Sequence, residues 1–115
     1  MIELPFPAKI LWPNGRGHHM AKHREAKKHK AWAYAAMLAD LRGAKHDGSP
    51  VTLRATFHPK TANAVDKDNA SASLKAYQDG IAQALGMDDS AFGQPIVHIA
   101  EPRKGGAVII EVEAI

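Results

Sequence analysis

Residues 51–57 alternate between apolar and polar side chains. A period of two predicts a β-strand with one buried face, because successive side chains of a strand point to opposite sides. The positions expected to be buried are Val51, Leu53, Ala55 and Phe57. Residues 1–6 predict a second, shorter strand, which ends in a segment containing two prolines.

Two other stretches carry apolar residues three and four positions apart, the spacing of an amphipathic helix. The first runs from about residue 22 to residue 42, contains neither Pro nor Gly, and is followed by Gly43. The second runs from Asn69 to Leu85 and is followed by Gly86. The apolar stripe is Ala31, Tyr34, Leu38 and Leu41 in the first helix, and Ala70, Leu74, Tyr77, Ile81 and Leu85 in the second.

Residues 95–102 and 105–114 are rich in β-branched and apolar side chains, and a basic, Gly-containing turn separates them. This pattern predicts a β-hairpin. The resulting order, β-α-β-α-β-β, predicts a small single α+β domain over residues 1–115, with two main helices on a mixed β-sheet.

The composition limits where the chain can act. It has 115 residues and no Cys, and no run of 18 apolar residues, which predicts a soluble protein that does not enter a membrane. The first residues lack a signal-peptide pattern, so we expect a cytoplasmic protein. A chain of this length buries a modest core, which makes a homodimer plausible.

Positive charge is concentrated between residues 16 and 30, where six Lys or Arg face one Glu, a net charge of +5 in a chain of +3. Such a block is typical of a surface that contacts nucleic-acid phosphates, although a solvated helix face has the same composition. The candidate nucleic-acid contacts here are Arg16, Lys22, Arg24, Lys27, Lys28 and Lys30, with Lys60, Lys67, Arg103 and Lys104 as outlying candidates.

Asp66 and Asp68 flank Lys67 just before the second predicted helix. In extended backbone, residues two apart point the same way and lie roughly 6.5 to 7 Å apart, so both carboxylates can approach one hard cation. The alternative is capping, with Asp68 or Asn69 as the first residue of the helix. An EF-hand calcium loop does not fit the residues that follow. Carboxylates without Cys favour Mg²⁺ or Mn²⁺.

We expect His18, His19, His23 and His29, in or beside the basic block, to contact phosphate or sugar. The alternative for His19 and His23, which are four residues apart, is a helical zinc pair. Trp12 and Trp32 are expected to pack in the core. Trp12, which lies beside a Pro- and Gly-containing loop, has the alternative of stacking on an unpaired base.

Three motifs in order, "DKDN", "LKAYQDGIAQAL" and "MDDSAF", resemble the RusA family of Holliday-junction resolvases. The likeness is strong over residues 64–92 and weaker toward both ends of the chain. It implies Mg²⁺-dependent resolution of four-way DNA junctions by a homodimer, through paired symmetric cuts that leave 5′-phosphates, in DNA recombination and repair.

The resemblance implies that Asp66, Asp68 and Asp89 bind the metal, with Asp88 as a possible further ligand. The family's helical lysine corresponds to Lys75, four residues before Asp79, and the alternative for Lys75 is a surface ion pair with Asp79. The gap between "DKDN" and that lysine is longer here than in the best-known members, so Lys67 stays a rival for the role.

A straight helix over residues 70–85 would separate its ends by roughly 24 Å, so Asp68 and Asp89 of one chain would not share a metal ion. Either the helix breaks near Gly80, or two copies pack antiparallel and each site combines acids from both subunits. We expect the dimer. The alternative functions are a catalytically inactive nucleic-acid-binding module, in which the acids only cap helices, and a metal-dependent phosphohydrolase acting on small nucleotides, which would not need the basic block.

Overall fold

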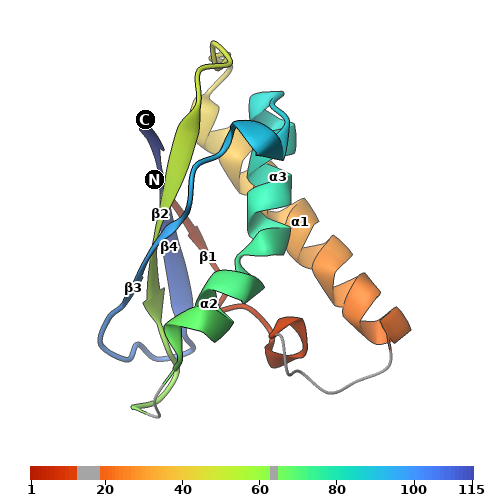
Figure 1. Ribbon diagram of the computed structural model, residues 1–115. Coiled ribbons are helices and arrows are strands. Elements are labelled where there is room, and N and C mark those ends of the chain that lie inside the picture. The colour runs from red at the N-terminus through yellow and green to blue at the C-terminus, as the bar shows by residue number, and fades with distance from the viewer. Residues whose placement is uncertain (13–18, 63–64) are drawn as a thin grey trace.

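The computed structural model describes residues 1–12, 19–62 and 65–115. The chain folds into two layers, a four-stranded mixed sheet and a set of helices on one face of it (Figure 1). This confirms the predicted α+β class. The elements, in chain order, are β1 (Ile2–Leu4), the short 3-10 helix η1 (Lys9–Leu11), α1 (His19–Leu41), β2 (Val51–His58), α2 (Lys67–Ser73), α3 (Lys75–Leu85), the 3-10 helix η2 (Asp89–Ala91), β3 (Ile96–Ile99) and β4 (Ala107–Ala114).

The strands lie in the order β1-β4-β2-β3. Strand β2 pairs antiparallel with β4 along its whole length and parallel with β3 on its other side. The parallel pair needs a long crossover, and α2 and α3 supply it over the face of the sheet.

The predicted hairpin between β3 and β4 is therefore wrong, because both strands pair with β2 and not with each other. The connecting residues 100–106 pass over the end of β2. Ala100 N–H donates to the Phe57 carbonyl (2.8 Å) and Arg103 N–H to the Pro59 carbonyl (2.9 Å). Seven connecting residues are enough to cross one strand, whereas a tight hairpin turn would hold the two strands side by side.

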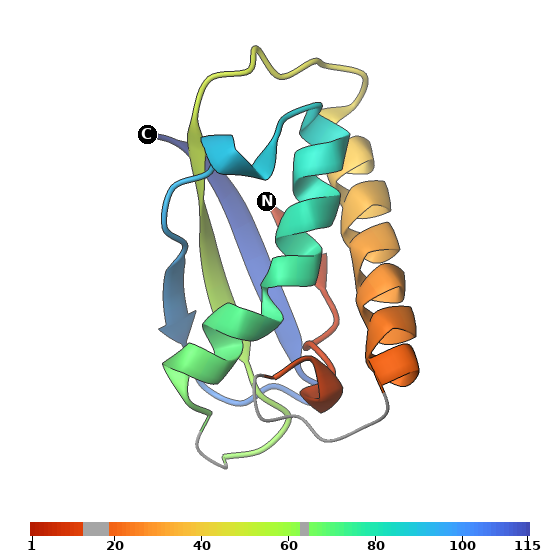
Figure 2. The same ribbon diagram turned by 45° about the vertical axis from the view of Figure 1, so that its right-hand side comes forward.

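Helix α1 exists as predicted and begins three residues earlier, but its buried stripe differs from the expected one. The buried side chains are His29, Ala33 and Met37, whereas Leu38 is 42% exposed. The helix packs along α3 (Figure 2). Close approach is possible because Gly80 has no side chain: a Cβ there would lie 2.2 Å from the Lys30 carbonyl oxygen.

The second predicted helix is two helices. Leu74 separates α2 from α3, which run in different directions (Figure 2). The break is at Leu74 rather than at Gly80, which lies inside α3. Gly86, in the left-handed conformation at φ 71°, ends α3 as expected. All five predicted stripe residues are buried: Ala70, Leu74, Tyr77, Ile81 and Leu85.

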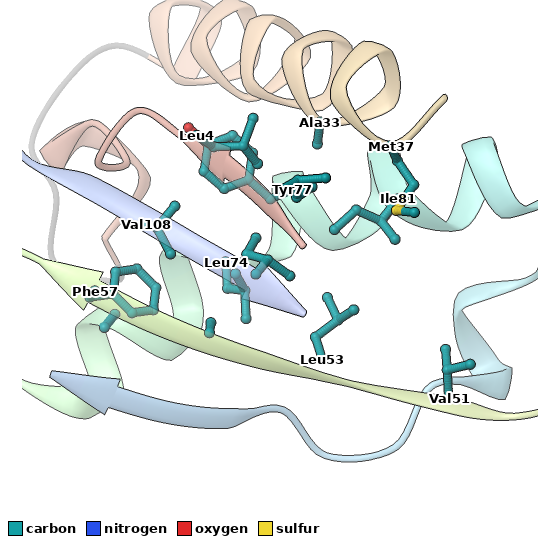
Figure 3. Packing of buried hydrophobic residues seen from close by; sticks show 14 of the residues in the cluster. Leu4, Ala33, Met37, Val51, Leu53, Phe57, Leu74, Tyr77, Ile81 and Val108 are labelled. Carbon is teal, nitrogen blue, oxygen red and sulfur yellow. The ribbon is translucent and has the colours of Figure 1, made fainter. Parts of the chain in front are cut away.

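The core lies between the sheet and α1 with α3 (Figure 3). Alternate residues of β2 enter it as the sequence predicts, since Val51, Leu53, Ala55 and Phe57 are at most 2% exposed. Within the described ranges, no helix is long and apolar enough to cross a membrane.

Candidate functional site

Asp66 directly precedes α2 and Asp68 lies in its first turn, so the two acids do not share the extended segment that was expected from the sequence. Asp66 is the residue that caps the helix: its backbone is extended, and its Oδ1 accepts a hydrogen bond from the Asp68 N–H at 2.7 Å. The prediction that Asp68 or Asn69 caps the helix is therefore wrong, because Asp66 is the cap. Asp68 lies within the first turn, where a carboxylate is stabilised by the helix dipole, and it is exposed. Lys67 is exposed beside them.

Lys75 joins two carboxylates from different elements. Its Nζ donates to Oδ1 of Asp79, one turn later on α3, at 2.8 Å, and to Oδ2 of Asp89 on η2 at 2.5 Å. The hydrogen bonds from Lys75 to Asp79 and to Asp89 raise the lysine's pKa above its ordinary value. All three side chains are partly exposed. The three charges therefore form one surface cluster that ties η2 to α3.

Asp88 caps η2 in the same way that Asp66 caps α2. Its Oδ1 accepts a hydrogen bond from the Ser90 N–H at 2.9 Å. This bond is the main reason that the pKa of Asp88 lies below its ordinary value. Asp88 therefore shapes the short helix that presents Asp89, and the two acids of the pair have different surroundings.

A cleft of about 400 Å³ separates the beginning of α1 from the bend between α2 and α3. Lys75 and Asp79 line one wall, and Lys22, with His19 and His23, lines the other. The remaining lining residues are Leu11, Ala26, Ala72, Ser73 and Ala76. The cleft thus joins the basic end of α1 to the Lys75 cluster.

The cleft spans the bend at Leu74, since residues of both α2 and α3 line it. Ser73, the last residue of α2, is buried, and its hydroxyl donates to the Ala70 carbonyl at 2.8 Å. At the other wall, Leu11 is held in place through η1. The Ala8 N–H donates to Nε2 of His29 at 3.2 Å, which leaves Nδ1 of His29 to donate to the Glu25 carbonyl at 2.8 Å.

The other cations of the basic block are distributed around α1. Lys28 contacts the ring of Trp32 (5.1 Å to its centroid) and pairs with Glu25 at 3.6 Å. Arg16 lies outside the described residues. Those that are exposed are Arg24, Lys27, Lys28 and Lys30. The block is therefore a positively charged helix with Lys22 directed to the cleft, and not a single basic face.

The remaining candidates lie around a second cleft or on the sheet. A cleft of about 500 Å³ is lined by Trp12, Lys60 and Val65 among others. Trp12 is half-buried, and its Nε1 has no hydrogen-bond partner among the described residues. Arg103 donates to Glu3 on β1 at 3.0 Å, and Lys104 is exposed in the neighbouring turn.

The predicted acids occupy two places. Asp66 and Asp68 lie at the start of α2, whereas Asp88 and Asp89 follow α3, and these places adjoin opposite ends of the α2–α3 unit (Figure 2). Among the described residues of this one chain, no three His, Asp or Glu side chains are grouped so that they could hold a metal ion. The pair of His19 and His23 likewise has no third ligand of these types in the described part of the chain.

The four-residue spacing indicated a surface ion pair between Lys75 and Asp79, and the structure confirms this pair. The sequence did not indicate that Asp79 also lines the cleft. The contact between Lys75 and Asp89 was not predictable from spacing, because it depends on the path of the chain after Gly86.

No protein-family model matches the chain. It is 37% identical, over 119 aligned positions, to an uncharacterised protein of Xylella fastidiosa (strain Temecula1), in an alignment that covers 99% of this chain and 76% of the relative. The chain belongs to the same family as that protein.

Proposed function

We propose that the protein is a Mg²⁺-dependent endodeoxyribonuclease of RusA type that resolves four-way DNA junctions, and that it acts as a homodimer in the cytoplasm. The observation that carries the proposal is the cleft, because it places cations of α1 opposite the lysine that holds Asp89. A nuclease needs cations that hold the phosphate backbone and acids that hold a metal, and Lys75 links the cleft to one of the candidate acids, Asp89.

Each wall of the cleft has its own task in this proposal. Lys22, with His19 and His23, contacts backbone phosphates, and the exposed cations along α1 extend the contact to neighbouring DNA. An ammonium has three donors, of which Lys75 uses two for Asp79 and Asp89. The third donor is left for an oxygen of the phosphate, where it would stabilise the negative charge that grows during cleavage.

The acids suit Mg²⁺ in their chemistry. This ion takes oxygen ligands, and one or two carboxylates together with substrate phosphate and water commonly hold it. Asp66 and Asp68 supply such a pair on one short turn. A bound Mg²⁺ would supply an activated water and neutralise charge on the phosphodiester. Asp89, already fixed by Lys75, would complete the ligand set with Asp88 beside it.

The separation of the two acid groups favours a dimer. Because Asp66 with Asp68 and Asp88 with Asp89 adjoin opposite ends of α2–α3, a second copy related by a two-fold axis would bring the first group of one subunit to the second group of its partner. Two such sites would suit a four-way junction, which needs two symmetric cuts.

A nucleic-acid-binding module without activity is the alternative. It is favoured by the capping roles of Asp66 and Asp88, whose carboxylates each bond to a backbone N–H two residues later. Caps explain why these residue types occur there without any metal. Caps do not account for Asp68 and Asp89, which have other structural partners: Asp68 lies in the first turn of α2, and Asp89 pairs with Lys75.

The test is cleavage of a synthetic four-way junction and a linear duplex of the same sequence, each with Mg²⁺ or with EDTA. The proposal predicts paired symmetric nicks in the junction with Mg²⁺ and intact DNA in EDTA. Binding to the junction without cleavage in Mg²⁺ or Mn²⁺ would favour the inactive module.

A further inference from the structure

We propose that Asp79 is a positioning residue for the cleavage reaction, which acts by holding the Lys75 ammonium where it contacts Asp89. The inference rests on the proposed function and extends it to a residue outside the expected metal ligands. The geometry is specific: Lys75 Nζ lies 2.8 Å from Asp79 Oδ1 and 2.5 Å from Asp89 Oδ2.

The two carboxylates restrict the positions that the Lys75 ammonium can take. Lysine has four rotatable bonds, and an ammonium attached to an exposed chain samples many positions. Lys75 is 57% exposed, so packing alone does not fix its end. Asp79 stands one helical turn away on α3, a rigid element, and directs the ammonium along the helix toward η2.

Asp79 also lies on the wall of the cleft together with Lys75. With two donors directed at carboxylates, the third donor of the ammonium is left for a group that enters the cleft. Removing the charge of Asp79 would leave Lys75 with Asp89 as its one carboxylate partner among the described residues. We expect the ammonium then to follow the carboxylate of Asp89 rather than keep its place beside the phosphate.

A purely structural role makes a different prediction. Ion pairs between exposed side chains contribute little to stability, and Asp79 and Lys75 are both partly exposed. Losing the pair would then change neither folding nor cleavage to a large extent. A marked loss of the cleavage step with unchanged folding therefore separates positioning from structural support.

The experiment compares Asp79→Asn, Asp79→Glu and Lys75→Met in single-turnover cleavage of a four-way junction at saturating protein, with DNA affinity measured separately. Asp79→Asn is expected to slow cleavage about tenfold, the usual effect of losing a residue that orients a catalytic group. Its DNA affinity should change less than twofold or so, and Asp79→Glu should recover most of the rate, because it keeps a carboxylate four residues from Lys75.

The double variant Lys75→Met with Asp79→Asn provides the decisive comparison. If Asp79 acts through Lys75, adding Asp79→Asn to Lys75→Met causes no further loss. The matched control is Glu113→Gln, which removes one carboxylate from the exposed ion pair with Arg54 (2.7 Å) on β2 and β4. It should cleave like the wild type. Equal losses from Asp79→Asn in both backgrounds would overturn the proposal.

A readout that does not depend on cleavage keeps the inference separate from the proposed function. In protein with ¹⁵N-labelled lysine side chains, the Lys75 ammonium signal, assigned with Lys75→Met, should be sharp in the wild type and Asp79→Glu. In Asp79→Asn it should shift or broaden, together with the backbone amides of residues 88–91. An unchanged signal would refute positioning by Asp79. An inactive wild type with the expected signals would refute the proposed function alone.

Discussion

At the scale of single residues, several polar side chains have a structural and a candidate chemical task at once. Asp66 caps α2 and is also a candidate metal ligand, and Lys75 ties η2 to α3 while it lines the cleft. A cap uses one carboxylate oxygen and leaves the other available. The two tasks are therefore compatible, and substitutions must separate folding from cleavage.

His29 gives a prediction about acid stability. It is 1% exposed, and burial lowers the pKa of its imidazole below the ordinary value of 6.5. The groups facing it are Glu25 and Lys28 on α1, Trp32 and Tyr77, whose rings it contacts, and the Ala8 N–H. Glu25 favours the charged form and Lys28 opposes it. A protonated Nε2 could no longer accept from Ala8.

Proton linkage gives the direction in which the stability of the folded protein changes with pH. A group with a lowered pKa binds a proton less readily in the folded state than in the unfolded one, so its stabilisation is complete above pH 6.5 and declines as the pH falls from there. Urea unfolding of the wild type should show this decline as the pH is lowered through 6.5. His29→Gln should be less stable at neutral pH and show a smaller decline. His98→Gln, on an exposed position of β3, is the control; equal slopes in His29→Gln and wild type would contradict the assignment.

At the scale of elements, the crossing of α1 and α3 depends on Gly80. An added Cβ would meet the Lys30 carbonyl oxygen at 2.2 Å, with Ala33 Cβ at 3.0 Å, so the backbones must separate. Gly80→Ala is therefore expected to lower the free energy of unfolding by about 1 to 3 kcal/mol, the usual cost of overpacking. Denaturant unfolding measures it.

Gly93→Ala is the matched control for Gly80. Its added Cβ would meet the end of the Ile115 side chain at 3.1 Å, which can move aside. Gly93→Ala is therefore expected to lower the free energy of unfolding less than Gly80→Ala does. Equal losses in the two variants would show that the helix crossing is not the tight point of the fold.

The sequence predicted elements better where one face is clearly apolar. In β2 and in α2–α3 the buried positions follow a single repeat, and the structure confirms them. Residues 31–38 of α1 are mostly apolar all around the helix, so the repeat did not select a face, and the true stripe includes the polar His29. The hairpin prediction was wrong because both final segments fit a strand, and sequence order does not say which strand each one pairs with.

The candidate site was predictable in its residue types and only partly in its arrangement. An acidic cap at the start of the second predicted helix was expected, but at Asp68 or Asn69 rather than at Asp66, and the cap at Asp88 was not predicted. The break at Leu74 was not predictable, since Leu74 has helical dihedral angles (φ −72°, ψ −19°) and an ordinary helix-forming side chain. Residues on both sides of this break line the cleft, and α3 begins directly after it, at Lys75.

At the scale of the whole molecule, the proposed dimer makes a complementation prediction. Asp68→Asn and Asp89→Asn should each abolish cleavage. If each site combines Asp68 of one subunit with Asp89 of its partner, a mixed dimer of the two variants contains one site with both acids intact. Mixing the inactive proteins, after unfolding and refolding together, should restore nicking of one strand.

Subunit exchange is verified with differently tagged copies, and separately refolded variants that are mixed afterwards serve as the control. Verified mixed dimers that stay inactive would contradict shared sites. Activity of a monomer, measured by sedimentation at the concentration used for cleavage, would do so as well.

The most direct test of the central proposal is the cleavage of a four-way junction by the wild type and by Asp68→Asn, with Mg²⁺ or EDTA. Asparagine keeps the shape of the side chain and removes the charge that a metal needs. The account predicts paired symmetric nicks by the wild type with Mg²⁺ alone, and binding without cleavage by Asp68→Asn. Wild-type protein that binds the junction and leaves it intact, or Asp68→Asn that cuts as fast as the wild type, would contradict it.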